Sequence, residues 1–248
     1  MKIILNILTH GDERIGLKVV REIKKLNINR NALVVQIANR RAFKLRKRFV
    51  DQDLNRSFPG KKNGNYEEKL AYKISPIIKS ADIVIDIHST RSDLKDAIIV
   101  TKLDRATKKY IKAMQPKYVL VMNATKNKAL ISQAKIGLAF EYGKDNDSAT
   151  LKKVVADIKK LFCYIGLIDI QLPKSKTTMQ YFNVVSEVTK PREYVLLKKI
   201  KNYKIVHKGE VFATNGKNPL IAKESFYPIL FGSENYETIF GFKGKRIF

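Results

Sequence analysis

Residues 2–13, KIILNILTHGDE, indicate the fold because an Ile- and Leu-rich run stops abruptly at a histidine. Such a run predicts a strand that is buried on both faces, as in a parallel sheet. Residues 82–88, DIVIDIH, repeat this pattern, and residues 136–142, IGLAFEY, form a third apolar run. Segments with helical periodicity separate the runs. The sequence therefore predicts an α/β fold, with a mostly parallel or mixed sheet and helices on both faces.

Further segments of the N-terminal part support this fold. Strands are expected at 33–38, 97–101 and 117–122, and helices at 13–26, 66–79, 104–114 and 148–165. Residues 39–64 are basic and then rich in turn-forming residues, which predicts a long loop of the kind that often carries function. Pro76 is expected to disturb the end of the helix at 66–79.

The sequence changes in character after about residue 172. Short β-prone stretches recur from Thr178 onward and are separated by Gly, Pro and Asn, which is typical of a small antiparallel β-domain. We therefore expect two units: an α/β domain at 1–172 and a small β-domain at 173–248.

The composition gives a strongly basic but foldable chain. Its 248 residues carry a net charge of +26, and 44% of them are hydrophobic, which excludes a disordered chain. Most of the basic residues are Lys, which is less suited than Arg to bidentate phosphate readout. One cluster is denser, formed by Arg40, Arg41, Lys44, Arg46, Lys47 and Arg48. Without a nucleic-acid-binding motif, we expect no specific nucleic-acid partner.

Two further features narrow the class of protein. Cys163 is the single cysteine, which excludes an internal disulfide framework and a cysteine-based zinc site. The sequence has no apolar run of about 18 residues, so no membrane span is expected. We expect a soluble, cytoplasmic protein.

Side chains with metal or acid–base chemistry end the predicted buried strands. His10 and His88 end two of them, and Glu141 lies near the end of a third. Ligand sites in open α/β sheets lie at the carboxyl ends of the strands, so we expect these residues to meet at one edge. Glu13 follows His10 by three residues, close enough for both side chains to reach one point.

Two His and one carboxylate with an open fourth position form the ligand set of a catalytic zinc site. Glu141 is available as the general base, and the Arg- and Asn-bearing loop 48–58 offers a cation for a developing oxyanion. Each residue alone also has a structural interpretation. Glu13 suits a helix N-terminus, and Asp86 is either a satisfied buried acid or a partner that orients a ligand His.

Four strings occur in an order that matches a known family: THGDE at 9–13, DLNRSFPG at 53–60, DIHST at 86–90 and FEYG at 140–143. The chain resembles the succinylglutamate desuccinylase and aspartoacylase family of zinc hydrolases, relatives of the zinc carboxypeptidases. The resemblance covers residues 1 to about 170. It implies that 1–172 is a zinc-hydrolase catalytic domain with a zinc carboxypeptidase-like fold, and that the small β-domain at 173–248 caps its site.

The resemblance also implies a role for each site residue. One zinc ion per chain would be bound by His10, Glu13 and His88. Glu141 would activate the water and pass its proton to the leaving amine, and Arg48 would polarise the amide carbonyl. Asn55 and Arg56 would hold the α-carboxylate of the substrate. The segment Tyr227-Pro228 followed by Tyr236 resembles the one that brings a Tyr into the site in aspartoacylases.

The sequence departs from the family pattern at Ile131. Aspartoacylases carry an Arg at this position, ten residues before the catalytic Glu, which contributes to recognising the side-chain carboxylate of the substrate. Lys128 and Lys135 lie nearby in the sequence, but neither is a direct replacement. Specificity for N-acetylaspartate is therefore not expected.

Three functions are compatible with these residues. The first is a zinc-dependent deacylase that cleaves the amide bond of a small anionic N-acyl amino acid, with esters as a second bond class. The second is a carboxypeptidase-like peptidase, since a carboxylate clamp also suits a peptide C-terminus. The third is a non-catalytic basic binding protein on the same fold, although a complete ligand set argues against it.

Overall fold

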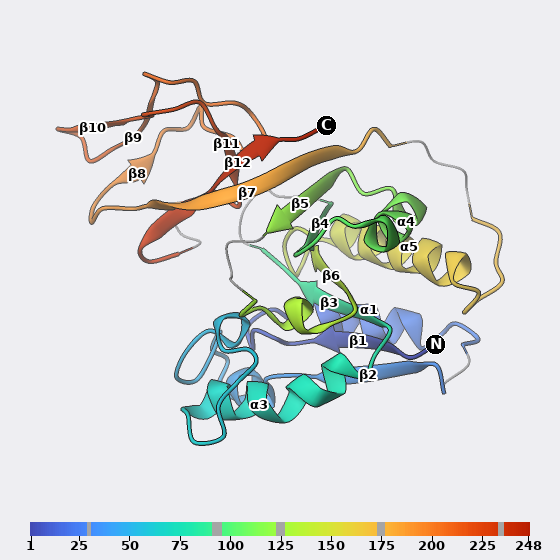
Figure 1. Cartoon of the computed structure of the whole chain (residues 1–248). Coiled ribbons are helices and arrows are strands. Elements are labelled where there is room, and N and C mark those ends of the chain that lie inside the picture. The colour runs from blue at the N-terminus through green and yellow to red at the C-terminus, as the bar shows by residue number, and fades with distance from the viewer. Residues whose placement is uncertain (29–30, 91–95, 123–126, 173–176, 233–235) are drawn as a thin grey trace.

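The computed structural model describes residues 1–248 except 29–30, 91–95, 123–126, 173–176 and 233–235. Its main feature is a nine-stranded sheet with the strand order β11-β12-β7-β5-β4-β6-β3-β1-β2 (Figure 1). These strands are β1 (Ile3–Ile7), β2 (Leu33–Ile37), β3 (Ile83–His88), β4 (Ala97–Val100), β5 (Tyr118–Met122), β6 (Ile136–Glu141), β7 (Gln180–Thr189), β11 (Tyr227–Ile229) and β12 (Ile239–Arg246).

The centre of the sheet is parallel, as the apolar runs predict. β1 pairs in parallel with β2 and β3, and β3 pairs in parallel with β6. Every residue of β1 and β3 is buried, because layers of side chains cover both faces of the sheet. β4 runs antiparallel to β6, so the sheet is mixed, and the predicted fold class is confirmed.

Helices cover the two faces of the sheet. On one face α1 (Ile15–Ile23), α4 (Arg105–Met114) and α5 (Ser148–Tyr164) pack over one apolar cluster, in which Ile7, Val19 and Ile158 are buried. On the other face α3 (Tyr66–Lys79) and the 3-10 turn η2 (Leu130–Gln133) cover a second cluster, which includes Ile4 and Ile78. The alternation of side chains along β1 therefore serves both layers.

The loop expected at 39–64 contains more regular structure than predicted. It includes a five-residue helix, α2 (Arg40–Lys44), and a 3-10 turn, η1 (Leu54–Arg56). The Asn39 side chain caps α2 by accepting a hydrogen bond from the Ala42 backbone N–H, and Ala42 is fully buried. A five-residue basic helix has too few turns to produce a periodic pattern, so its stability comes from this cap and from packing.

Pro76 lies inside the last turn of α3, whose bounds are those expected from the sequence. The helix continues through it to Lys79, and Ile78 beyond it is fully buried. Proline removes one hydrogen bond near the end of the helix, where the buried apolar face still holds the last turn in place. At the other end, Asn65 and Glu68 form a capping box.

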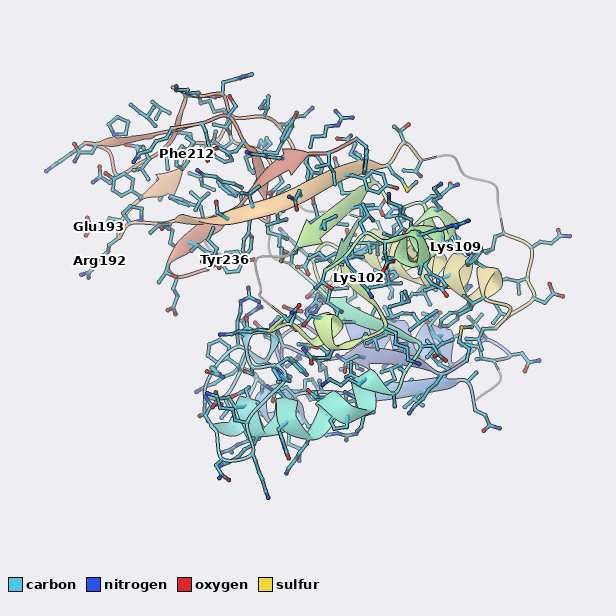
Figure 2. The ribbon with its side chains drawn as sticks, viewed as in Figure 1. Lys102, Lys109, Arg192, Glu193, Phe212 and Tyr236 are labelled. Carbon is cyan, nitrogen blue, oxygen red and sulfur yellow. The ribbon has the colours of Figure 1, made fainter. Side chains whose placement is uncertain are left out.

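The C-terminal part is antiparallel β structure, as predicted. β12 pairs antiparallel with β7 on one side and with β11 on the other. β8 (Val195–Leu196), β9 (Val211–Thr214) and β10 (Pro219–Ile221) form a separate small sheet. Phe212 of β9 packs with Phe226 and Phe240 in its own apolar cluster (Figure 2). β7 also pairs in parallel with β5, so the main sheet continues past residue 172. The division into 1–172 and 173–248 stays a prediction.

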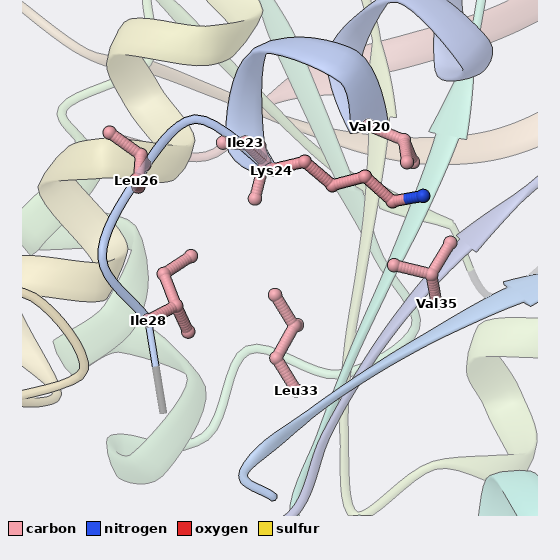
Figure 3. Close-up of a pocket in the computed structure, with 7 residues that line it drawn as sticks. All are labelled: Val20, Ile23, Lys24, Leu26, Ile28, Leu33 and Val35. Carbon is pink, nitrogen blue, oxygen red and sulfur yellow. The ribbon is translucent and has the colours of Figure 1, made fainter. Parts of the chain in front are cut away.

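An apolar pocket of about 340 Å³ lies between α1 and β2 (Figure 3). It is lined by Val20, Ile23, Lys24, Leu26, Ile28, Leu33 and Val35. Leu33 pairs with Ile3 at the amino end of β1, so this pocket opens at the edge opposite the carboxyl ends of the strands. Within the described residues, no helix is long and apolar enough to cross a membrane.

Candidate metal centre and active site

Three buried side chains converge beyond the carboxyl ends of β1 and β3. Nδ1 of His10 lies 2.7 Å from one carboxylate oxygen of Glu13, and Nδ1 of His88 lies 2.8 Å from the other. One ligand atom from each residue falls within 4.8 Å of the others. Because β1 and β3 are adjacent and parallel, His88 and the turn after β1 reach the same point.

Gly11 allows the turn between His10 and Glu13 to pass close to α2. A Cβ atom at this position would lie 2.3 Å from the backbone carbon of Ala42, which is closer than atoms approach without a shift. The Gly11 N–H also donates a hydrogen bond of 2.9 Å to the backbone oxygen of Arg48. The glycine therefore brings the donor-bearing turn into contact with the loop that carries Arg48.

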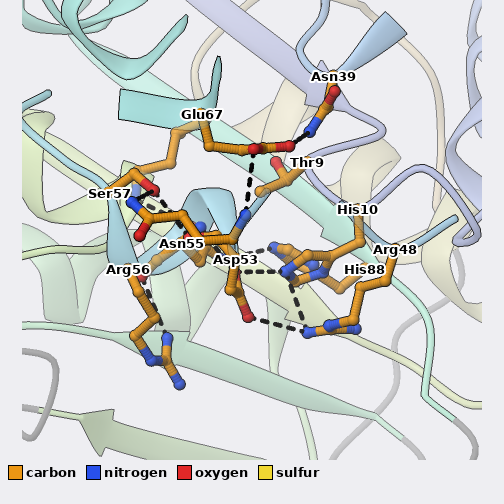
Figure 4. A network of polar contacts seen from close by, with 12 residues as sticks. Thr9, His10, Asn39, Arg48, Asp53, Asn55, Arg56, Ser57, Glu67 and His88 are labelled. Carbon is orange, nitrogen blue, oxygen red and sulfur yellow. Dashed lines mark hydrogen bonds and ion pairs between the residues drawn. The ribbon is translucent and has the colours of Figure 1, made fainter. Parts of the chain in front are cut away.

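The second ring nitrogen of each histidine faces a carboxylate. Nε2 of His10 lies 3.0 Å from Asp53 (Figure 4), and Nε2 of His88 lies 2.8 Å from Asp86. A carboxylate facing Nε2 accepts a hydrogen bond from the Nε2–H tautomer, which leaves the Nδ1 lone pair available to a cation. Both imidazoles direct Nδ1 at Glu13, an arrangement that is compatible with metal binding.

Asp86 is both a satisfied buried acid and an orienting partner. Its other oxygen accepts hydrogen bonds of 2.7 Å from the Asn6 side-chain amide and 2.8 Å from the Thr9 hydroxyl. Burial raises the pKa of Asp86, but His88 and these donors outweigh burial and lower it. The carboxylate therefore stays ionised beside His88.

The charges around the histidines suit a bound cation. Burial lowers the pKa of His88, yet the negative charges of Asp86 and Glu13 raise it well above its ordinary value. The same holds more weakly for His10, whose pKa is raised chiefly by Glu13 against the effect of burial. Two imidazole nitrogens and a carboxylate oxygen, buried and surrounded by carboxylates, form a donor set that fits a divalent ion such as zinc.

Glu141 ends β6 next to this cluster and pairs in register with His88. Removal of its carboxylate from water raises the pKa of Glu141 to about 7, although the positive charge of His88 lowers it. A carboxylate with this pKa is suited to accept and return a proton near neutral pH. The position and the pKa together fit a general base.

Arg48 reaches the cluster from the loop. Its guanidinium donates a hydrogen bond of 2.8 Å to Glu13 and approaches Nε2 of His10 to 3.0 Å and Asp53 to 3.4 Å. Burial lowers the pKa of Arg48, but Glu13 and Asp53 outweigh burial and raise it. Arg48 therefore keeps its positive charge beside the three donor side chains.

Asn55 and Arg56 occupy η1, on the same loop. The Asn55 side chain accepts a hydrogen bond of 3.0 Å from the Leu130 N–H, and its amide nitrogen lies 3.5 Å from Nε2 of His88. Arg56 is exposed and donates to the Asn55 backbone oxygen, so its side chain lies apart from the histidines (Figure 4). Because the Arg56 guanidinium is exposed, it is accessible to a carboxylate in solution.

Tyr236 lies on the C-terminal side of the site, just before β12 (Figure 2). Burial raises its pKa, as does the charge of Glu141, while Arg48 and Arg56 lower it. The charges of Glu141 on β6 and of Arg48 and Arg56 on the loop therefore act on this hydroxyl in opposite directions. Tyr227, in contrast, packs against Phe182 with ring centres 5.1 Å apart, as expected of a core residue.

Ile131 lies in η2 and is 4% exposed, within the second apolar cluster. Its side chain contributes no charge at the position where the resemblance expects an arginine. At this position the site therefore has a buried apolar side chain where the family pattern has a cation.

Asp53 is a site residue to which the sequence alone assigned no role. It accepts from the Asn55 N–H at 2.8 Å, and its contacts with His10 and Arg48 link η1 to the donor cluster. Burial raises the pKa of Asp53, but His10 and Arg48 outweigh burial and lower it. Its place at the start of the DLNR string was the available signal.

The described fold is a mixed α/β sheet with a His-Glu-His cluster at the carboxyl ends of its strands. The sequence profile of the succinylglutamate desuccinylase/aspartoacylase catalytic domain matches residues 2–165, more than half of the chain. The chain therefore belongs to this family, which confirms the resemblance seen in the sequence motifs.

Individual relatives agree with this assignment. A probable aspartoacylase of Trichodesmium erythraeum (strain IMS101) is 28% identical over 155 residues, which span 54% of this chain and 53% of the relative. A probable aspartoacylase of Acaryochloris marina (strain MBIC 11017) is 26% identical over 207 residues, 71% of this chain and 69% of the relative. The crystal structure of murine aminoacylase 3 superposes with a TM-score of 0.81 at 17% identity, covering 100% of this chain and 95% of that one.

Proposed function

We propose that the protein is a zinc-dependent hydrolase that cleaves the amide bond of N-acyl amino acids. The observation that carries the proposal is the convergence of His10, Glu13 and His88, with Glu141 and Arg48 beside them, in a member of this family. Two relatives that are named probable aspartoacylases support the same class of reaction.

His10, Glu13 and His88 would hold the ion through two Nδ1 atoms and one carboxylate oxygen. Bound zinc lowers the pKa of a coordinated water and polarises a carbonyl oxygen. Glu141 takes the proton from the attacking water and then delivers it to the amide nitrogen as the carbon–nitrogen bond breaks. The products are a carboxylate from the acyl group and a free amino acid.

Arg48 stabilises the negative charge that develops on the carbonyl oxygen. Its guanidinium is already held near the donor cluster by Glu13 and Asp53, so little reorganisation is required when that charge appears. Asn55 and Arg56 bind the α-carboxylate, and Tyr236 closes the C-terminal side of the same site. With Ile131 in place of a cation, the substrate side chain need not carry a second carboxylate.

A substrate panel tests this proposal directly. N-acetyl, N-succinyl and N-formyl amino acids are incubated with the protein before chelation, after chelation, and after zinc is restored. We expect hydrolysis of at least one of the N-acyl amino acids, its loss on chelation and its recovery with zinc. Release of C-terminal residues from short peptides, without turnover of the N-acyl amino acids, would instead identify a peptidase.

A further inference from the structure

Glu67, the second residue of α3, is fully buried beside the loop that carries Arg48 and Asp53. One of its carboxylate oxygens accepts hydrogen bonds from the Val50 N–H at 2.7 Å and from the Asn39 side chain at 3.0 Å. The other oxygen accepts from the backbone N–H groups of residues 51 and 52, at 2.9 and 3.2 Å. Each oxygen therefore has two donors.

Three of these donors are consecutive backbone N–H groups, at residues 50–52. Successive N–H groups that point at one anion curve the chain around it and fix the local backbone path. All four donors are neutral amide N–H groups, and together they occupy the acceptor positions of both carboxylate oxygens of Glu67. Its geometry suits an anchor for the loop.

Hydrogen bonds between the loop and α3 are donated in both directions. The Asp51 carboxylate accepts a hydrogen bond of 2.8 Å from the Tyr66 N–H, one of the free donors at the start of α3. Glu67 in turn binds the backbone of the segment that contains Asp51. This reciprocal pairing ties residues 50–52 to a helix that packs on the main sheet.

Residues 50–52 lie between Arg48 and Asp53, the two loop residues in contact with His10. A shift of the backbone at 50–52 would therefore move both side chains relative to the donor cluster. We propose that Glu67 is a positioning residue, which sets Arg48 and Asp53 at the site by fixing the loop. The inference rests on the proposed function only for its effect on turnover.

Glu67→Ala and Glu68→Ala form a matched pair of variants. Glu68 is the next residue on the same helix, but it binds Asn65 and Lys61 and makes none of the contacts with residues 50–52. Its loss weakens the capping box, so Glu68→Ala controls for reduced stability of α3. Glu67→Gln retains one acceptor oxygen and serves as the conservative variant, and as the substitute if Glu67→Ala does not fold.

Two measurements compare the variants with the parent protein, all in the zinc-loaded form. Hydrogen exchange of the backbone amides at 50–52 measures how firmly the loop is held in place, and it requires no known substrate. We expect exchange to be at least about tenfold faster in Glu67→Ala and unchanged in Glu68→Ala. With a substrate, kcat should fall by about tenfold to 100-fold in Glu67→Ala at unchanged zinc content, with Glu67→Gln intermediate.

The outcomes separate this inference from the proposed function. Exchange at 50–52 that is unaltered in both Glu67 variants, or equally altered in Glu68→Ala, overturns the positioning role. Faster exchange with kcat within about threefold of the parent also overturns it. If no N-acyl amino acid is hydrolysed by the parent protein, the proposed function fails, while the exchange result still decides whether Glu67 fixes the loop.

Discussion

The site combines two regions that hold their side chains in different ways. At the strand edge, His88 and Glu141 are placed by parallel pairing, in which each residue has a fixed partner on the next strand. In the loop at 48–56, Arg48 and Asp53 are placed by hydrogen bonds with side chains far away in the sequence. The strand edge is therefore rigid because of the fold, whereas the loop depends on a few polar contacts.

This difference leads to different consequences of substitution. Loss of a strand-borne donor should remove the metal or the proton transfer outright. Loss of a loop contact should leave the site assembled but less well oriented. The four predictions below follow this order, from the removal of a donor to the screening of long-range charge.

His88→Ala should have the largest effect, because it removes a metal donor and leaves Asp86 and Glu13 buried without their shared partner. We expect the bound zinc to fall from about one equivalent to about a tenth or less, and turnover to fall with it. Metal analysis of the purified protein measures the change. His207→Ala is the matched control, since His207 is exposed in the C-terminal part and distant in the sequence from all site residues. Full zinc content in His88→Ala would contradict the assignment of ligands.

Glu141→Gln should separate metal binding from proton transfer. The variant keeps a side chain of the same size on β6 but removes the proton acceptor whose pKa is raised to about 7. We expect unchanged zinc content and a fall in kcat of about 10²- to 10⁴-fold. Steady-state kinetics with the best substrate of the panel measures it. Turnover within a few-fold of the parent would show that another group accepts the proton.

Asp53→Asn should have a smaller effect, because it alters a loop contact and keeps the donors. The negative charge facing Nε2 of His10 and the Arg48 guanidinium is lost, while the shape of the side chain is kept. We expect zinc affinity to weaken by about tenfold to 100-fold. Competition with a chelator measures it. Asp82→Asn, at the amino end of β3, is the control, and equal affinities in the two variants would exclude an orienting role for Asp53.

The strand-borne half of the site was predictable from the sequence. The strands of the central sheet are buried on both faces, and the sequence therefore shows largely apolar runs at 2–9, 82–88 and 136–142. The residue at which each run stops predicts where its strand ends. The positions of His10, His88 and Glu141 at one edge follow from that pattern. The helices at 66–79 and 104–114 were likewise located to within a residue or two.

The rest depends on contacts that no local pattern contains. α2 is stabilised by the Asn39 cap and by burial of Ala42, and its five residues are too few for a periodic signal. The roles of Asp53 and Glu67 follow from hydrogen bonds between residues 15 to 43 positions apart, which only the folded chain brings together. The pairing of β7 with β5 is a tertiary contact of the same kind.

Added salt should have the smallest effect, and it tests whether the net charge of +26 contributes to function. A cationic protein raises the local concentration of an anionic substrate, and mobile ions screen this attraction over a Debye length of about 8 Å at physiological ionic strength. We expect kcat/KM for an N-acyl amino acid to fall about two- to tenfold between 0.01 M and 0.3 M salt, with kcat unchanged. The control is the corresponding N-acyl amino acid amide, which lacks the α-carboxylate and should show no such decline. An equal response of both substrates would mean that salt acts on the protein itself. A kcat/KM independent of salt would show that the excess Lys does not steer the substrate, and that Arg48 and Arg56 act only at contact distance.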